Sequence, residues 1–247
     1  MNPAMHSVET ALEHLLATAR PPSAWETLPA DAAQGRILAD PLVAQVTVPP
    51  LDNSAMDGYA VHLADCADEA TLPVTQRIPA GSLGHALARG EAARIFTGAP
   101  LPAGADAVVM QEDCATDADR VRILRLPKPG ANIRRAGEDI AAGQTVLAAG
   151  SRLGAAQLGV AASVGATQLT VYTRLKVAIF FTGDEIVLPG AALGPGQIYN
   201  SNRAALLGLL HGLGCTVIDL GQVGDSLDAT VAALETAAAQ ADVILTS

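Results

Sequence analysis

The sequence carries acidic, hydroxyl and glycine residues in a short stretch that could form a loop-based site. Residues 48–61 read VPPLDNSAMDGYAV and show neither helical nor strand periodicity. Asp52 and Asn53 can hydrogen-bond their own backbone, and Gly58 tolerates a positive φ, so the segment can form a tight loop that holds Asp57 in a fixed direction. An ordinary turn between two strands would have the same composition, and the spacing alone does not decide between the two.

Two further stretches offer groups that could bind an anion. In RIFTGAPLPAGADAVVMQED, Thr97 and Gly98 follow an apolar run, and a hydroxyl with exposed backbone N–H groups at such a position can receive an anion. In KPGANIRRAGEDI, Lys128, Arg134 and Arg135 lie beside glycines and could supply positive charge. A structural turn in the first stretch and a solvated basic turn in the second are the alternatives.

The last seventy residues alternate between apolar runs and helical segments: KVAIFFTG, SNRAALLGLLHGLG, CTVIDLG, LDATVAALETAAAQA and DVILTS. This order predicts a parallel α/β sheet with right-handed crossovers, in which ligands bind beyond the carboxyl ends of the strands. Asp184 and Glu185 follow the first predicted strand, and Asp225 and Ser226 follow the second. Helix capping would explain Ser226 but not Glu185.

Carboxylates that converge on a cleft repel an anionic substrate unless a hard divalent cation lies between them. Mg²⁺ is commonly held by one or two carboxylates together with substrate phosphates. The acidic strand ends and the glycine-containing stretches therefore suggest metal-dependent phosphate or oxyanion chemistry.

Composition excludes several functional classes. The 247 residues allow two domains, and hydrophobic residues make up 50% of them but aromatic residues only 3%. A net charge of −10 argues against a nucleic-acid partner. The three cysteines show no disulfide or zinc spacing, and no P-loop, G-x-G-x-x-G or H-E-x-x-H motif occurs. No signal peptide or membrane-spanning run is found, so we expect a cytoplasmic protein.

The remaining segments divide the chain into regions. Apolar spacing predicts an amphipathic helix from Val8 to Leu16, and prolines flank a short predicted helix over 30–38. Short apolar runs with glycine and proline predict a β-rich unit over 46–146, and SRLGAAQLGVAASVG predicts another helix. We expect a helical region of residues 1–45 and 147–175, a β-rich domain over 46–146 and an α/β domain over 176–247.

Six motifs in this order make the chain resemble one family, the molybdopterin molybdenumtransferases, which comprise MoeA and the gephyrin E domain. The motifs are PPLDNSAMDGYAV, RIFTGAPLPAGADAVVMQED, NIRRAGEDI, FFTGDEIVLPG, GQIYNSN and ADVILTS. The resemblance implies a helical linker and dimerisation domain, a β-rich lid domain and a three-layer, MogA-like α/β domain. It also implies an enzyme that inserts molybdenum from molybdate into adenylylated molybdopterin and releases AMP in a Mg²⁺-dependent step.

The resemblance also assigns roles to residues. Asp57, Thr97, Glu185 and Asp225 would be catalytic. We infer that Asp57, Glu185 and Asp225 position the metal and substrate and that Thr97 contacts the oxyanion. Binding of the molybdopterin would fall to a second set of residues: Thr182, Gly183, Asp184, Asn200, Ser201 and Arg135. Because the β-rich unit of one subunit faces the α/β unit of its partner in the family, a homodimer is implied, with a molybdopterin adenylyltransferase as the substrate donor.

Family members continue beyond the TS at the end of this sequence into a glycine-rich loop and a C-terminal β-barrel domain. We therefore expect the chain to be a fragment of such a protein. The alternative function is a non-catalytic pterin-binding module or a gephyrin-like scaffold, because one fold can host both.

Overall fold

The computed structural model describes residues 6–67 and 70–247, which form two compact units. Unit 1 comprises the described residues within 1–40, 149–158 and 167–247, and unit 2 comprises those within 41–148 and 159–166. Helix α2 (Ala155–Ser163) has residues in both. No described helix is long and apolar enough to cross a membrane.

Unit 1 contains the α/β region that the sequence predicts and a two-stranded antiparallel sheet. Its elements are α1 (Val8–Thr18), β1 (Trp25–Pro29), η1 (Ala30–Ala32), β12 (Gln168–Tyr172), β13 (Lys176–Thr182), β14 (Ile186–Val187), β15 (Ile198–Tyr199), α3 (Ser201–Leu213), β16 (Thr216–Val223), α4 (Leu227–Gln240) and β17 (Val243–Thr246).

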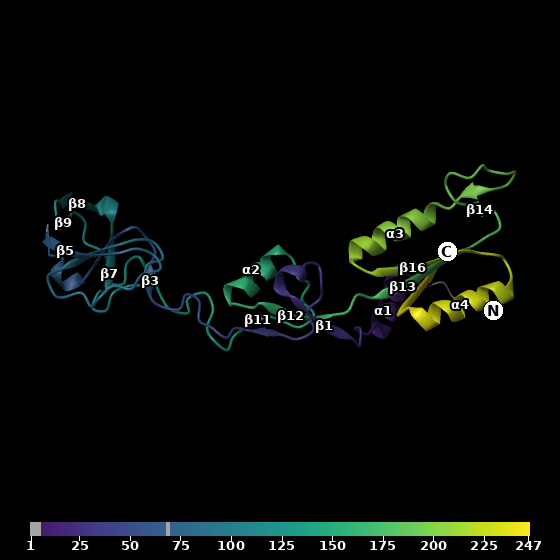
Figure 1. The fold of residues 1–247 in the computed structure, drawn as a ribbon, viewed down its shortest axis with the longest axis horizontal. Helices are drawn as coiled ribbons and strands as arrows, with labels where there is room; N and C mark the ends of the chain where they lie inside the picture. Colours follow the sequence, from purple (N-terminus) through teal and green to yellow (C-terminus); the bar gives the residue numbers. More distant parts are fainter. Residues whose placement is uncertain (1–5, 68–69) are drawn as a thin grey trace. The chain divides into compact units, whose positions relative to one another are not determined.

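The parallel sheet of unit 1 has the strand order β16-β13-β17. Strand β13 lies at its centre, so every residue from Val177 to Phe181 is buried, which agrees with the apolar run KVAIFFTG. Helices α3 and α4 cover opposite faces of the sheet (Figure 1). The alternation of strands and helices predicted for this region is confirmed, and all three strands end at the same edge.

The predicted helix over 30–38 is wrong. Only the single 3₁₀ turn η1 forms, after strand β1, which pairs with β12 along its whole length. Gly35 then adopts a φ of 75°, which ends any helix, and Leu38 forms a bridge to Val171 of β12 and is buried. Burial of Leu38 against a strand overrides the helical propensity of the alanines.

Unit 2 is β-rich, as predicted. Its elements are β2 (Leu42–Val43), β3 (Asn53–Ser54), β4 (Gly58–Val61), η2 (Leu63–Asp65), β5 (Thr71–Ile78), β6 (Ala92–Ile95), β7 (Ala107–Met110), η3 (Gln111–Asp113), β8 (Cys114–Asp117), β9 (Arg120–Ile123), β10 (Ile133–Arg134) and β11 (Thr145–Leu147). Six of these strands form one mixed sheet in the order β7-β4-β6-β5-β9-β8, and only β5 and β6 are parallel neighbours in it.

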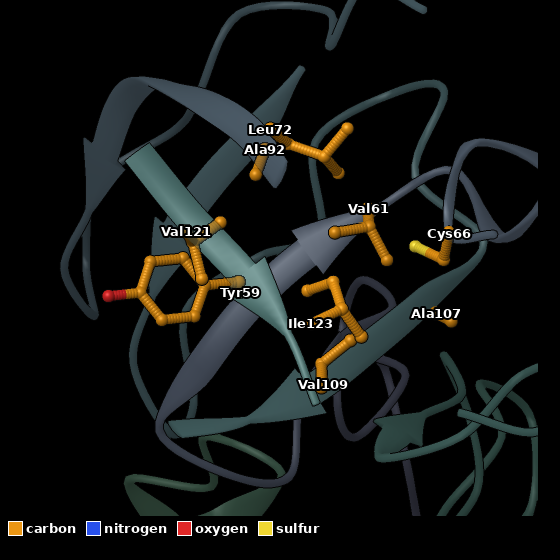
Figure 2. Packing of buried hydrophobic residues seen from close by; sticks show 9 residues of the cluster. All are labelled: Tyr59, Val61, Cys66, Leu72, Ala92, Ala107, Val109, Val121 and Ile123. Atoms are coloured by element: carbon orange, nitrogen blue, oxygen red, sulfur yellow. The ribbon is translucent and has the colours of Figure 1, made fainter. Parts of the chain in front are cut away.

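Small and β-branched side chains build the core of unit 2. Figure 2 shows Val61, Val109 and Ile123 packed together, and Tyr59 at the margin with its hydroxyl pointing away from the other labelled side chains. A second cluster, with Ile78 and Ile95, is also buried. The low aromatic content therefore still allows a close-packed interior.

Gly58, at the start of strand β4, is required because the neighbouring strand β7 approaches its backbone closely, not because of a positive φ. It is absent from the residues with positive φ, whereas a Cβ built on it would lie 1.9 Å from the carbonyl oxygen of Val109. Any side chain at this position would push β4 away from β7, with which it pairs from Gly58 to Val61.

We predict that Gly58→Ala lowers the free energy of unfolding of unit 2 by about 2 kcal/mol or more, because the extra methyl group overpacks the β4–β7 contact. Urea denaturation followed by circular dichroism measures this loss. Gly159→Ala is the matched control, because a Cβ on this helical glycine meets nothing within 4 Å, so its stability should be unchanged or higher. Equal stability of Gly58→Ala and the wild type would contradict this packing argument.

Candidate functional site

A loop before β4 and a turn after β6 are fastened together by backbone hydrogen bonds. Ser54 N donates to the carbonyl of Ala99 at 2.9 Å, and Gly98 N donates to the carbonyl of Ser54 at 2.8 Å. The buried Ser54 hydroxyl donates to the carbonyl of Met56 at 2.6 Å and so fixes the turn that precedes Asp57. The part of the stretch VPPLDNSAMDGYAV that precedes β4 is therefore ordered, although it lacks regular periodicity.

The structure brings together Asp57 and Thr97, two predicted catalytic residues separated by forty positions. Asp57 Oδ1 accepts hydrogen bonds from Thr97 N at 2.8 Å and from Thr97 Oγ1 at 2.9 Å. Within the described residues, no hydrogen bond reaches Asp57 Oδ2, so this oxygen can contact a ligand or a cation. Thr97 thus orients the carboxylate, whereas its predicted contact with an oxyanion stays a prediction.

Asp57 is held in its charged form. The backbone and hydroxyl hydrogen bonds from Thr97, followed by the positive charge of Arg94, lower the pKa of Asp57 below its ordinary value. A carboxylate with a lowered pKa is a poor proton donor at neutral pH but a good ligand for a cation. Sequence reasoning missed Arg94, because its place opposite Tyr59 exists only once β4 and β6 pair.

Asp52 and Arg135 stabilise the start of the loop that precedes β4 and carries Asp57. Arg135 Nη1 and Asp52 Oδ2 form an ion pair at 2.5 Å, and Ala136 N donates to Asp52 Oδ1 at 2.8 Å. The expectation that Asp52 and Asn53 cap their own backbone is wrong, because Asp52 binds a distant turn and Asn53 Oδ1 is buried without a partner among the described residues. Arg135, predicted to bind the cofactor, is engaged with Asp52.

The second group of predicted residues lies at the carboxyl edge of the parallel sheet in unit 1. Thr182 ends β13, and its backbone N–H donates to the carbonyl of Ser247 at 2.9 Å. Gly183 has a φ of 132°, which residues with a side chain rarely adopt, and the Glu185 carboxylate folds back toward it, because a Cβ built on Gly183 would lie 2.6 Å from Glu185 Oε2. Gln222 Nε2 donates to the carbonyl of Gly183 at 2.6 Å and joins the ends of β13 and β16.

Three exposed carboxylates follow these strands: Asp184 and Glu185 after β13 and Asp225 after β16. Asp184 lies near the end of β16, because a Cβ on Gly224 would be 4.0 Å from Asp184 Oδ1. None of the three carboxylates has a hydrogen-bond or ion-pair partner in residues 6–67 and 70–247. Unpaired oxygen donors at a sheet edge fit the ligand preferences of Mg²⁺, although no group of three or more His, Cys, Asp or Glu side chains gathers in this part of the chain.

Asn200 and Ser201 mark the start of α3. The buried side chain of Asn200 accepts a hydrogen bond from Arg203 N at 3.0 Å and thereby caps the helix. The neighbouring Asn202, which sequence reasoning missed, donates from Nδ2 to Ser247 Oγ at 2.7 Å. Ser226 caps α4 by accepting from Ala229 N, as the capping interpretation predicted.

The predicted site residues therefore form two groups. Asp57, Thr97 and Arg135 belong to unit 2, whereas Thr182, Glu185 and Asp225 belong to unit 1 together with Gly183, Asp184, Asn200 and Ser201. A site that combines the two groups is a prediction of the resemblance.

Comparison with known proteins yields two family matches that together cover nearly the whole chain. Residues 6–165 match the "MoeA N-terminal region (domain I and II)", and residues 178–247 match the "Probable molybdopterin binding domain". A protein from Haemophilus influenzae named molybdopterin molybdenumtransferase is 42% identical over 92% of this chain, and one from Nostoc with the same name is 43% identical over 87%. The chain spans 56% and 51% of the lengths of these proteins.

Solved structures give the same result. Two crystal structures of the molybdopterin biosynthesis protein MoeA from Pyrococcus horikoshii are similar to this chain, with TM-scores of 0.81 and 0.88, sequence identities of 36% and 31%, and 98% and 96% of this chain covered. The chain covers 63% and 65% of those two chains. The mixed α/β fold, the matched domains and the sequence identity show that this chain belongs to the MoeA family.

Proposed function

We propose that the protein to which this chain belongs is a molybdopterin molybdenumtransferase, which inserts molybdenum from molybdate into adenylylated molybdopterin and releases AMP. The observation that carries the proposal is the Asp57–Thr97 pair: a carboxylate held in its charged form by two hydrogen bonds, with its second oxygen available. The relatives' names and the match to a molybdopterin-binding domain support the choice of substrate.

Mg²⁺ is proposed as the metal, with Asp57, Glu185 and Asp225 as its ligands. The support is chemical: these side chains offer hard oxygen donors, and no described partner neutralises Glu185 or Asp225. When bound, the cation would offset the repulsion between these carboxylates and the phosphates of the substrate. The residues of the chain position the reactants: Thr97 orients Asp57, while Gly183 and Gln222 fix the strand end that carries Glu185.

The predicted domains are proposed as a linker and dimerisation domain of residues 1–45 and 147–175, a lid of residues 46–146 and a molybdopterin-binding domain of residues 176–247. The boundaries of unit 2 at residues 41 and 148 support the limits of the lid. In this arrangement Thr182, Gly183, Asp184, Asn200 and Ser201 would contact the molybdopterin. Arg135 would contact it as well or hold the Asp57 loop in place through Asp52.

A cytoplasmic homodimer is proposed, in which the lid of one subunit and the molybdopterin-binding domain of its partner complete each site. A molybdopterin adenylyltransferase would supply the substrate. The exposed apolar face of α1 supports a protein partner: Val8, Leu12, Leu15 and Leu16 are between 52% and 81% exposed, and no residue of this helix is buried. Such a contiguous apolar face is typical of an interface.

We predict that Asp57→Asn in the full-length protein lowers molybdate- and Mg²⁺-dependent release of AMP by about a hundredfold, because the amide cannot replace the charged oxygen. The measurement is AMP formation from adenylylated molybdopterin. Asp31→Asn, at an exposed position in η1, is the control and should keep wild-type activity. If the wild-type protein binds the substrate tightly but releases no AMP, it is a carrier or scaffold and the enzymatic proposal fails.

A second prediction concerns the charge of Asp57. Thr97→Val removes the hydroxyl donor but keeps the backbone N–H, so the pKa of Asp57 should rise part of the way toward its ordinary value. In the wild type, these bonds favour the folded protein above the ordinary carboxyl pKa, and the contribution is lost as the pH falls through the lowered pKa. Carboxyl-carbon NMR titration measures the shift, with Thr145→Val as control. An unchanged pKa in Thr97→Val would show that the hydroxyl does not stabilise the carboxylate.

The dimer predicts a further effect on α1. Replacing Leu12 and Leu15 by glutamate should shift the protein from dimer to monomer, because the charges would be buried in the interface. Light scattering after size exclusion measures the mass, and Glu13→Ala, which leaves the apolar residues intact, should remain dimeric. A wild-type monomer, or a Leu12→Glu/Leu15→Glu variant that stays dimeric, would contradict this role of α1.

A further inference from the structure

A hollow on the main sheet of unit 2 gathers three arginines from three strands. Its cavity volume is about 560 Å³, and Arg77 of β5, Arg94 of β6 and Arg120 of β9 line it together with Tyr59 and Asp119. Strand register creates this gathering, because Arg94 lies directly opposite both Tyr59 and Arg77. Residues paired across neighbouring strands point to the same face of a sheet, so these side chains share one surface. We call it the basic hollow.

Aromatic rings fix the orientation of two of these arginines. The guanidinium carbons of Arg77 and Arg94 lie 4.4 Å and 4.7 Å from the centre of the Phe96 ring, and that of Arg94 lies 5.1 Å from the centre of the Tyr59 ring. These contacts cover the flat faces of the guanidinium groups, while the N–H donors lie at their edges. Arg94 is further held by bonds to the carbonyl of Gly58 at 2.9 Å and to Gln111 Oε1 at 2.7 Å.

The positive charge of the basic hollow is not neutralised by ion pairs. Within the described residues, Arg77, Arg94 and Arg120 pair with no carboxylate, whereas Arg89, Arg134 and Arg135 of the same unit do. Asp119 is the acidic residue among those lining the hollow, and Glu91 and Glu112 approach it only through bonds to Thr75 and Gln111. Three guanidinium groups therefore line the hollow together with one carboxylate, although the chain as a whole has a net charge of −10.

We propose that the basic hollow binds the phosphate group of a small molecule, either free phosphate or diphosphate or a phosphate ester. Guanidinium edges that converge from different strands suit a tetrahedral oxyanion that can accept several charge-assisted hydrogen bonds. The exposed hydroxyl of Thr116 lies in the same lining and can donate as well, whereas the Thr75 hydroxyl already donates to Glu91 Oε2 at 3.1 Å. The inference rests on these contacts and does not depend on the transferase activity.

The position of the basic hollow connects it to the Asp57 loop. Arg94 binds the carbonyl of Gly58, the residue after Asp57, and Phe96 directly precedes Thr97. A phosphate bound to Arg94 would therefore lie close to the residues that orient Asp57. The hollow would thus provide an anion-binding position on unit 2 beside the loop that carries Asp57.

Isothermal titration calorimetry of the full-length protein at low ionic strength tests the inference, with inorganic phosphate, diphosphate and AMP as separate probes. Arg77→Ala is the informative variant, because the Arg77 guanidinium contacts a ring but donates no described hydrogen bond, so its loss should leave the fold intact. We expect its dissociation constant for the bound probe to rise at least about tenfold, because a charge-assisted contact is lost. Arg125→Ala, at an exposed position of the same unit outside the hollow, should bind like the wild type.

The three probes distinguish the sources of the phosphate group. Binding of inorganic phosphate or diphosphate that is lost in Arg77→Ala identifies a site for the free anion. Binding of AMP alone identifies a site for an ester only where Arg77→Ala abolishes it, because AMP bound at the transferase site would be unaffected by this substitution. No binding of any probe to the wild-type protein would overturn the inference. It would also be overturned if Arg77→Ala and Arg120→Ala, both shown to be folded by circular dichroism, bound every probe with wild-type affinity. Loss of AMP release with intact probe binding would count against the transferase alone.

Discussion

The candidate site depends on the hydrogen bonds that Thr97 makes to one oxygen of Asp57. They join a loop before β4 to a turn after β6, and the strand pairing between β4 and β6 sets the distance between the two. The same two hydrogen bonds both orient the Asp57 side chain and favour its charged form. Ser54 and the ion pair between Asp52 and Arg135 hold the rest of the loop, so Asp57 presents its second oxygen from an ordered segment.

Unit 1 also positions carboxylates, but by a different arrangement. The parallel strands end at one edge of the sheet. The side chains that follow them are therefore brought to the same edge by the strand order, and not by hydrogen bonds between them. Gly183 lets Glu185 fold back toward the strand, and Gln222 connects the ends of β13 and β16. The exposed carboxylates at the sheet edge of unit 1 and the arginines that line the hollow of unit 2 carry opposite charges.

Much of this could be predicted from the sequence because the relevant signals are local. Alternating apolar runs and helical segments revealed β13, β16, β17 and the helices between them, and the strand-end rule placed Asp184, Glu185 and Asp225 at one edge. Non-local contacts could not be read in this way. The partner of Asp52 is a turn more than eighty residues away, Leu38 forms a bridge to β12 instead of continuing a helix, and the row of Tyr59, Arg94 and Arg77 exists only after three strands pair.

In the proposed homodimer, each site would combine Asp57 of one chain with Glu185 of its partner. Mixing full-length Asp57→Asn and Glu185→Gln proteins, after dissociation and reassociation, tests it directly by AMP release. In a dimer with shared sites, each mixed dimer contains one site with both wild-type residues, so activity should recover to roughly a quarter of the wild-type value. If Asp57 and Glu185 of the same chain formed the site, every site would carry one substitution, and the mixture would be as inactive as either variant alone.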